Sequence, residues 1–189
     1  MRLFYLHLAL SLMCFTMNCH YLGDASRDKS EISHLKFTLP NGNLLSPEFW
    51  NKGYTVLYFG FSHCPDMCPL ALTNFGRASL ILGPLGNQVR FVFVTLDPER
   101  DNPTLLENYS KQFPGGKLVA LSPTNESILR LGEIFGLINK KVNFGNSYTV
   151  DHSNFIYILD ENINQIAALP GGTSANVISE QLRKIIIKN

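Results

Sequence analysis

Two cysteines near the middle of the chain are the residues best suited to chemistry. Cys64 and Cys68 are separated by three residues within residues 60–69, GFSHCPDMCP. The segment leads from an apolar, β-prone run into a helical pattern, so the sulfurs are expected beside the first turn of a helix, where backbone amides favour anions. That placement lowers the pKa of a thiol. Because a thiolate is both a nucleophile and a soft metal ligand, the pair predicts redox or metal chemistry.

The spacing favours chelation without excluding a disulfide. Cys-x-x-x-Cys is one residue longer than the common redox motif Cys-x-x-Cys, and the extra residue widens the bite between the sulfurs. The third candidate ligand is His152, which stands just before an apolar strand pattern. Two thiolates and an imidazole suit copper better than calcium or magnesium, whereas a closed structural zinc site normally has four protein ligands. Asp151 is expected to hydrogen-bond the imidazole and fix its tautomer.

Other residues near these ligands are expected to have supporting roles. His63 adjoins Cys64, which leaves little room for both to bind one ion, so we expect it to support the loop. Met67 is expected to be an apolar contact under the loop. Residues 97–101 (DPERD) form a charged strand-end turn, for which a self-paired structural loop and a direct functional role are both open.

Size and composition limit the class of protein. The chain has 189 residues, with 16 Lys and Arg against 15 Asp and Glu, and this length suits one domain with a hydrophobic core. The near-neutral balance argues against nucleic acid as a partner, since that needs a concentrated basic field. The other two cysteines, Cys14 and Cys19, lie in an apolar leader. One close pair in the folded part is not the pattern of a disulfide-stapled miniprotein.

Residues 1–19 predict export. A small positive start is followed by almost wholly apolar residues 3–17, which suit a secretory signal better than a bilayer span of roughly 20 residues. Cys19 is a candidate for the lipid-modified residue of a lipoprotein, although Met17 and Asn18 make a poor cleavage site. A plain signal peptide or a short uncleaved anchor is the alternative. Residues 20–33 are polar and are expected to tether a domain at 34–189.

The pattern along the domain predicts an α/β fold. Strands are expected at 54–60, 89–96, 118–121, 153–159 and 165–169, helices at 70–82, 104–112, 126–135 and 174–187, and an Asn-Gly hairpin at 35–45. Residues 140–147 are expected to be a polar loop that lets His152 move. This order predicts a central mixed sheet flanked by helices. Function in such sheets gathers at the carboxyl ends of central strands, where Cys64 lies.

Three separated segments resemble the Sco/SenC family of copper chaperones. They are residues 59–69 (FGFSHCPDMCP), 95–101 (TLDPERD) and 148–153 (YTVDHS), in the family's order, and the similarity extends over most of 35–187. Ser62 and Met67 depart mildly from the family, which often carries Thr and Ile there, and neither change removes a ligand. The leader departs more, because many relatives have a longer membrane-spanning anchor.

The resemblance implies a thioredoxin-like fold and copper bound by Cys64, Cys68 and His152, with Asp97 as a supporting residue near the metal. It also implies a role in maturing the binuclear copper site of cytochrome c oxidase, by delivering copper or by keeping the site's cysteines reduced. The expected partners are the copper-site subunit and another periplasmic copper chaperone or a thioredoxin-like reductant. The expected location is the periplasm, with membrane attachment through the N-terminus.

Copper transfer by ligand exchange is the leading hypothesis, because three protein ligands leave a position open to a partner thiolate. A thiol–disulfide oxidoreductase is a second hypothesis: Cys64 or Cys68 would attack a partner disulfide through a mixed disulfide, and His152 need not be a ligand. A peroxiredoxin-like peroxidase ranks below both, since it needs one activated cysteine with a nearby arginine and the local sequence offers His63 instead.

Overall fold

The computed structural model describes residues 29–188. The leader with Cys14 and Cys19, and residues 20–28 of the expected tether, lie outside the described residues. Folded structure is already present at η1 (Lys29–His34), a 3-10 helix whose Ile32 is fully buried. The folded part therefore includes residues 29–33, which were expected to belong to the tether. Across the described residues, no helix is both long enough and apolar enough to cross a bilayer.

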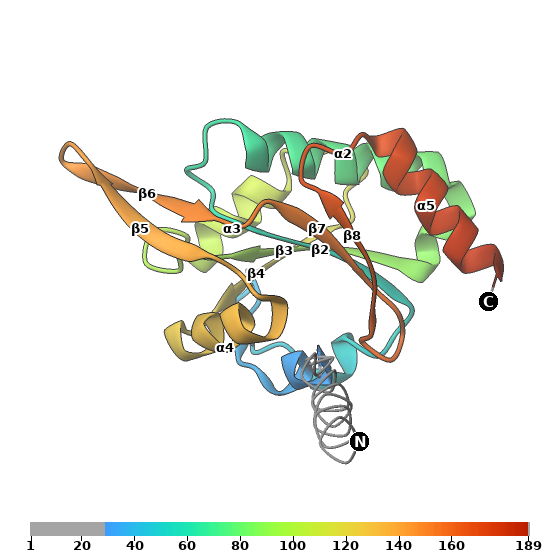
Figure 1. Ribbon diagram of the computed structural model, residues 1–189, viewed down its shortest axis with the longest axis horizontal. Helices are drawn as coiled ribbons and strands as arrows, with labels where there is room; N and C mark the ends of the chain where they lie inside the picture. Colours follow the sequence, from blue (N-terminus) through green and yellow to red (C-terminus); the bar gives the residue numbers. More distant parts are fainter. Residues whose placement is uncertain (1–28, 189) are drawn as a thin grey trace, which may run out of the picture.

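A six-stranded mixed sheet forms the centre of the domain (Figure 1). In spatial order its strands are β1 (Phe37–Thr38), β4 (Leu118–Pro123), β3 (Val89–Thr95), β2 (Tyr54–Gly60), β7 (Phe155–Leu159) and β8 (Gln165–Pro170). Strands β2, β3 and β4 are parallel, whereas β1, β7 and β8 join antiparallel to their neighbours. This arrangement confirms the expected mixed sheet.

Helices cover both faces of the sheet (Figure 1). One face carries α2 (Met67–Leu82), α3 (Pro103–Ser110) and α5 (Ala175–Lys188), and the other carries α4 (Asn125–Phe135) with η1 and η2 (Pro47–Phe49). The short η3 (Gly83–Gln88) follows α2. Along β2, Val56 and Tyr58 point into the first core while Leu57 and Phe59 point into the second. Burial on both faces explains why this strand is a continuous apolar run rather than an alternating one.

A second, two-stranded sheet replaces the polar loop expected at 140–147. Strands β5 (Asn139–Phe144) and β6 (Ser147–His152) pair in the register that sets Asn139 opposite His152, and this β5–β6 hairpin projects from the domain (Figure 1). The loop prediction was wrong because most of the hairpin is exposed and polar, which hides the alternation of buried positions. The glycine-type turn signals in this segment were interpreted as part of a loop, whereas the Gly145-Asn146 pair between the strands is a dipeptide that favours two-residue hairpin turns.

The N-terminal hairpin is smaller than expected. Gly42 occupies the turn at φ 85°, as the Asn-Gly pair predicts, and Thr38 bridges Leu44. Strand β1, however, is only two residues long and pairs mainly with β4. The other helices and strands lie where they were expected, with ends that differ by at most three residues; the largest difference is at α2, which begins at Met67 rather than at residue 70.

Candidate metal centre

The cysteine loop, residues 61–66, connects the carboxyl end of β2 to the start of α2. The Cys64 N–H donates to the Phe61 carbonyl at 3.2 Å, which closes the loop. Cys68 is the second residue of α2 and is buried, whereas Cys64 is half-buried, and both are free thiols. The Cys68 N–H donates to Cys64 Sγ at 3.5 Å. The Cys64 sulfur therefore lies against the positive end of the helix, as the sequence predicted.

Gly60, the last residue of β2, allows the start of α2 to approach the sheet closely. A Cβ at this position would lie 2.6 Å from Cys68 Sγ and 3.1 Å from the Phe93 ring. These separations are shorter than van der Waals contact, so any side chain would push the cysteine away. The absence of a side chain at Gly60 is what places Cys68 against the central strand.

His152 is the last residue of β6 and lies across from the cysteines. Its Nε2 is 3.9 Å from Cys68 Sγ. The imidazole packs edge-on against the rings of Phe61 and Tyr58, with centroids 5.9 Å and 6.3 Å away. The topology therefore brings the three sequence-predicted ligands together from two segments that are more than 80 residues apart.

The imidazole is held by a backbone carbonyl rather than by Asp151. His152 Nδ1 lies 3.0 Å from the Ser153 carbonyl oxygen. With its proton on Nδ1, the imidazole would donate it to this carbonyl and offer the Nε2 lone pair to a metal, whereas a proton on Nε2 would be donated to the sulfurs. The Asp151 side chain is exposed, because successive residues of β6 point to opposite faces of the strand. The expectation that Asp151 fixes the tautomer was wrong for this reason.

The two thiols share a proton unequally. The Cys68 thiol donates to the Cys64 sulfur, and this hydrogen bond is the main reason why the pKa of Cys64 falls to about 3. Burial opposes the decrease in pKa, while hydrogen bonds from His152 and from the Asp66 and Cys68 amides add to it. The pKa of Cys68 is raised by the same pairing and by burial. Cys64 is thus a ready thiolate, and Cys68 must release its proton when a metal binds.

The distances fit one small, soft ion. With bonds of about 2.3 Å to sulfur and 2.0 Å to imidazole nitrogen, as in zinc sites, a trigonal site would separate these two atoms by about 3.7 Å. The observed separation between Cys68 Sγ and His152 Nε2 is 3.9 Å. Within residues 29–188, no three His, Cys, Asp or Glu side chains lie close enough together to hold an ion. The three side chains would therefore have to move slightly closer together to bind one ion.

A small cavity opens beside the three ligand candidates. It has a volume of about 200 Å³ and is lined by Phe61, Cys64, Pro65, Met67, Thr149, Val150, Asp151, His152 and Asn154. Met67 forms part of its wall and is partly exposed. Its expected place as an apolar contact under the loop stays a prediction. Asn154 accepts a hydrogen bond from the Tyr58 hydroxyl at 2.9 Å, which ties this wall to β2. Cys64 therefore lines an opening on this side of the loop.

The 97–101 turn, which follows β3, is bonded to both ligand-bearing segments. Asp97 is fully buried, and its carboxylate is paired with Arg100 and accepts from the Tyr148 hydroxyl at 2.8 Å. Asp101 is also fully buried and accepts from the Ser62 N–H at 2.8 Å. Sequence reasoning chose Asp97 but overlooked Asp101, Arg100 and Tyr148, although the density of charge in DPERD was the available signal.

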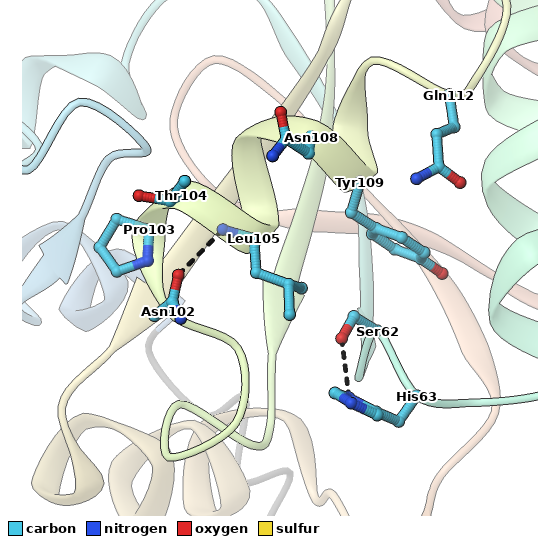
Figure 2. A pocket seen from close by; sticks show the side chains of 9 residues that line it. All are labelled: Ser62, His63, Asn102, Pro103, Thr104, Leu105, Asn108, Tyr109 and Gln112. Atoms are coloured by element: carbon cyan, nitrogen blue, oxygen red, sulfur yellow. Dashed lines mark hydrogen bonds between the residues drawn. The ribbon is translucent and has the colours of Figure 1, made fainter.

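His63 lies on the other side of the cysteine loop. Its Nδ1 is 3.0 Å from the Ser62 hydroxyl and 3.6 Å from the Asp101 carboxylate. With α3 it borders a larger hollow of about 760 Å³, lined by Ser62, His63, Asn102, Pro103, Thr104, Leu105, Asn108, Tyr109 and Gln112 (Figure 2). None of the three ligand candidates lines this hollow. The contacts of His63 agree with the expected role in the loop.

Comparisons with known proteins identify related sequences. The family model described as SCO1/SenC matches residues 24–187. The chain is 33% identical over 125 residues to the SCO2-like protein RP587 of Rickettsia prowazekii, covering 65% of this chain and 60% of that protein. It is 31% identical over 136 residues to the mitochondrial protein SCO2 of Saccharomyces cerevisiae, covering 68% and 44%. The chain thus spans less than two thirds of the length of these two relatives.

Solved structures share the fold. ScoI of Bradyrhizobium japonicum with copper bound superposes with a TM-score of 0.72 at 26% identity, covering 79% of this chain and 96% of that one. ScoI of Arabidopsis thaliana with copper bound gives a TM-score of 0.75 at 26% identity, covering 82% and 97%. These matches confirm the expected thioredoxin-like α/β fold.

Proposed function

The chain belongs to the SCO1/SenC family, and we propose that it is a metallochaperone that binds copper and serves the assembly of cytochrome c oxidase. The observation that carries the proposal is the approach of His152 Nε2 to 3.9 Å from Cys68 Sγ, with the Cys64 thiolate beside it. Copper is bound in two of the related ScoI structures. Two sulfurs and one imidazole match the preference of copper for soft ligands.

The two sulfur ligands have different parts in the transfer of copper. Cys64 is half-buried and has a low pKa, so it leaves the metal as a stable thiolate without needing a proton. Cys68 is buried with a raised pKa, so it takes up a proton when copper departs. A partner thiolate forms its bond to copper as the Cys64 bond breaks, and the neighbouring cavity provides its route. The copper ion is cargo and keeps its oxidation state in this exchange.

We assign the copper-site subunit of the oxidase as acceptor, and a second periplasmic copper chaperone or a thioredoxin-like reductant as upstream partner. The same dithiol would keep the acceptor's cysteines reduced by forming and resolving a mixed disulfide. The apolar leader supports export to the periplasm, and Cys19 supports attachment to the membrane by lipid. Mass spectrometry of the exported protein tests the leader, because lipid on Cys19 adds a defined mass.

Titration of the reduced protein with Cu(I) against a competing chelator tests the function. We expect one copper per chain, with binding strongly weakened in Cys64→Ser, Cys68→Ser and His152→Ala. His34→Ala is the matched control, since His34 is exposed in η1 and should leave binding unchanged. Unchanged stoichiometry and affinity in a ligand variant would remove that residue from the site. Rapid exchange of the metal-free dithiol with a partner dithiol, without copper binding, would favour the oxidoreductase instead.

A further inference from the structure

We propose that the 97–101 turn is a brace that fixes the distance between the cysteine loop and the β5–β6 hairpin, so that Arg100, Asp101 and Tyr148 are positioning residues for copper binding. The inference deepens the proposed function and rests on it. None of these three side chains is a candidate ligand. Their role would be to hold His152 within reach of the two sulfurs before copper arrives.

One end of the brace is bonded to the cysteine loop. The Asp101 carboxylate accepts from the Ser62 N–H at 2.8 Å and from the Ser62 hydroxyl. It also accepts from the Thr95 hydroxyl at the end of β3, at 2.5 Å. Ser62 is two residues before Cys64, so these bonds fasten the loop that carries Cys64 and leads into α2 to the end of a central strand.

The other end is bonded to the hairpin. Arg100 lies over the Tyr148 ring, with 3.8 Å from its Cζ to the centroid, and donates from Nη1 to the Tyr148 carbonyl at 2.9 Å. The Tyr148 hydroxyl donates to Asp97 at 2.8 Å. On the facing strand, Lys141 pairs with Glu99 at 2.7 Å. Both strands of the hairpin are thus held by the same short turn.

Tyr148 and His152 share one face of β6. Positions 148, 150 and 152 are the less exposed ones of the strand, as the two-residue period of a strand requires. Phe61 links the two ends, because its ring lies 5.9 Å from the Arg100 guanidinium and 5.9 Å from the His152 ring. Any shift of Tyr148 away from the turn therefore carries His152 with it.

The hairpin needs such a brace because it is not part of the central sheet. An isolated two-stranded hairpin is marginally stable in water, and β5 and β6 pair with each other in a separate sheet. Burial of Asp97 and Asp101 would cost free energy unless both were well paired. Arg100 Nη2 is itself buried without a hydrogen-bond partner. A gain in stability is a poor explanation for burying these charged groups. A role in fixing the positions of the copper ligands explains it better.

Two mild substitutions test the brace. Tyr148→Phe removes the bond to Asp97 but keeps the ring under Arg100, and Arg100→Lys removes the planar fork but keeps the charge. Tyr157→Phe is the control for Tyr148→Phe, since Tyr157 on β7 packs between Phe59 and Phe135, away from the 97–101 turn. Arg130→Lys is the control for the second, because Arg130 pairs with surface glutamates on α4 and η1. Circular dichroism verifies that each variant is folded.

We expect Cu(I) to bind 10- to 100-fold more weakly in both brace variants, as for residues that orient metal ligands, and with wild-type affinity in both controls. In the metal-free protein, amide hydrogen exchange in residues 139–152 should be about tenfold faster in the brace variants. Folded variants with wild-type affinity and wild-type exchange would overturn the inference. If the wild-type protein bound no copper, the proposed function would fail. The amide hydrogen exchange of residues 139–152 would still test whether the 97–101 turn holds the hairpin.

Discussion

The reactivity of Cys64 in the metal-free protein is a sensitive test of the sulfur pair. With its pKa at about 3, Cys64 should be a thiolate from pH 5 to 8. An ordinary thiol with a pKa of 9.0 is about 0.01% thiolate at pH 5 and about 1% at pH 7. Nucleophilicity falls with pKa with a coefficient of about 0.4–0.5, so the Cys64 thiolate is intrinsically roughly 500-fold weaker.

The larger thiolate fraction of Cys64 outweighs its lower nucleophilicity at pH 5, whereas the lower nucleophilicity outweighs the larger fraction at pH 7. Cys64 should react with iodoacetamide roughly 20-fold faster than an ordinary thiol at pH 5 and roughly fivefold slower at pH 7. Half-burial of Cys64 lowers all its rates together. The decisive quantity is therefore the slope with pH, which should be close to zero between pH 5 and 8.

Replacement of Cys68 isolates the cause. Cys68→Ala removes the hydrogen bond that contributes most to the low pKa, so the pKa of Cys64 should rise and its alkylation rate should increase with pH. Cys68→Ser is the matched control, because a hydroxyl still donates and the profile should stay flat. The assay is mass spectrometry of alkylated Cys64 at fixed times. A tenfold rise in the wild-type rate for each pH unit up to pH 8 would refute the reasoning.

Three further substitutions test the geometry around the sulfurs. Gly60→Ala places a methyl group 2.6 Å from the present position of Cys68 Sγ, so it should destabilise the fold by about 1–3 kcal/mol in urea denaturation, and an unchanged midpoint would contradict the close packing. Asp101→Asn replaces one accepting oxygen with a donor facing Ser62, which should cost about 1.5–3 kcal/mol for the lost charged hydrogen bond, measured as a lower thermal midpoint. Asp151→Ala should leave copper affinity within about twofold, because this side chain is exposed; a larger loss would restore it as a partner of the imidazole.

Several features of the site were predictable because they are local. The thiol pair precedes a helix within one short segment, and the apolar run at β2 marks a strand buried on both sides. Since parallel strands place their carboxyl ends at one edge of the sheet, the cysteine loop had to lie at such an edge. His152 was predicted as a ligand by its residue type and position before a strand, and the structure brings it to the sulfurs.

Other features were not predictable in the same way, because they depend on exposure. The β5–β6 hairpin contains few buried residues, so the polar composition of residues 139–147 concealed its pairing. Asp151 and His152 are adjacent in sequence but point to opposite faces of β6. Residues 148–152 were not assigned to any predicted strand, so no faces were defined for Asp151 and His152 when Asp151 was chosen as the partner of the imidazole.

The amino-acid sequence by itself determined the chemistry of this protein, namely two thiols at a helix start, one imidazole, and the strands and helices that carry them. These follow from residue type and short-range periodicity, which each segment contains in itself. The tertiary structure alone decided which thiol holds the proton, which atom orients His152, and that the 97–101 turn bonds both ligand-bearing segments. Those outcomes depend on distances between residues far apart in the chain, and such distances exist only once the sheet has brought the segments together.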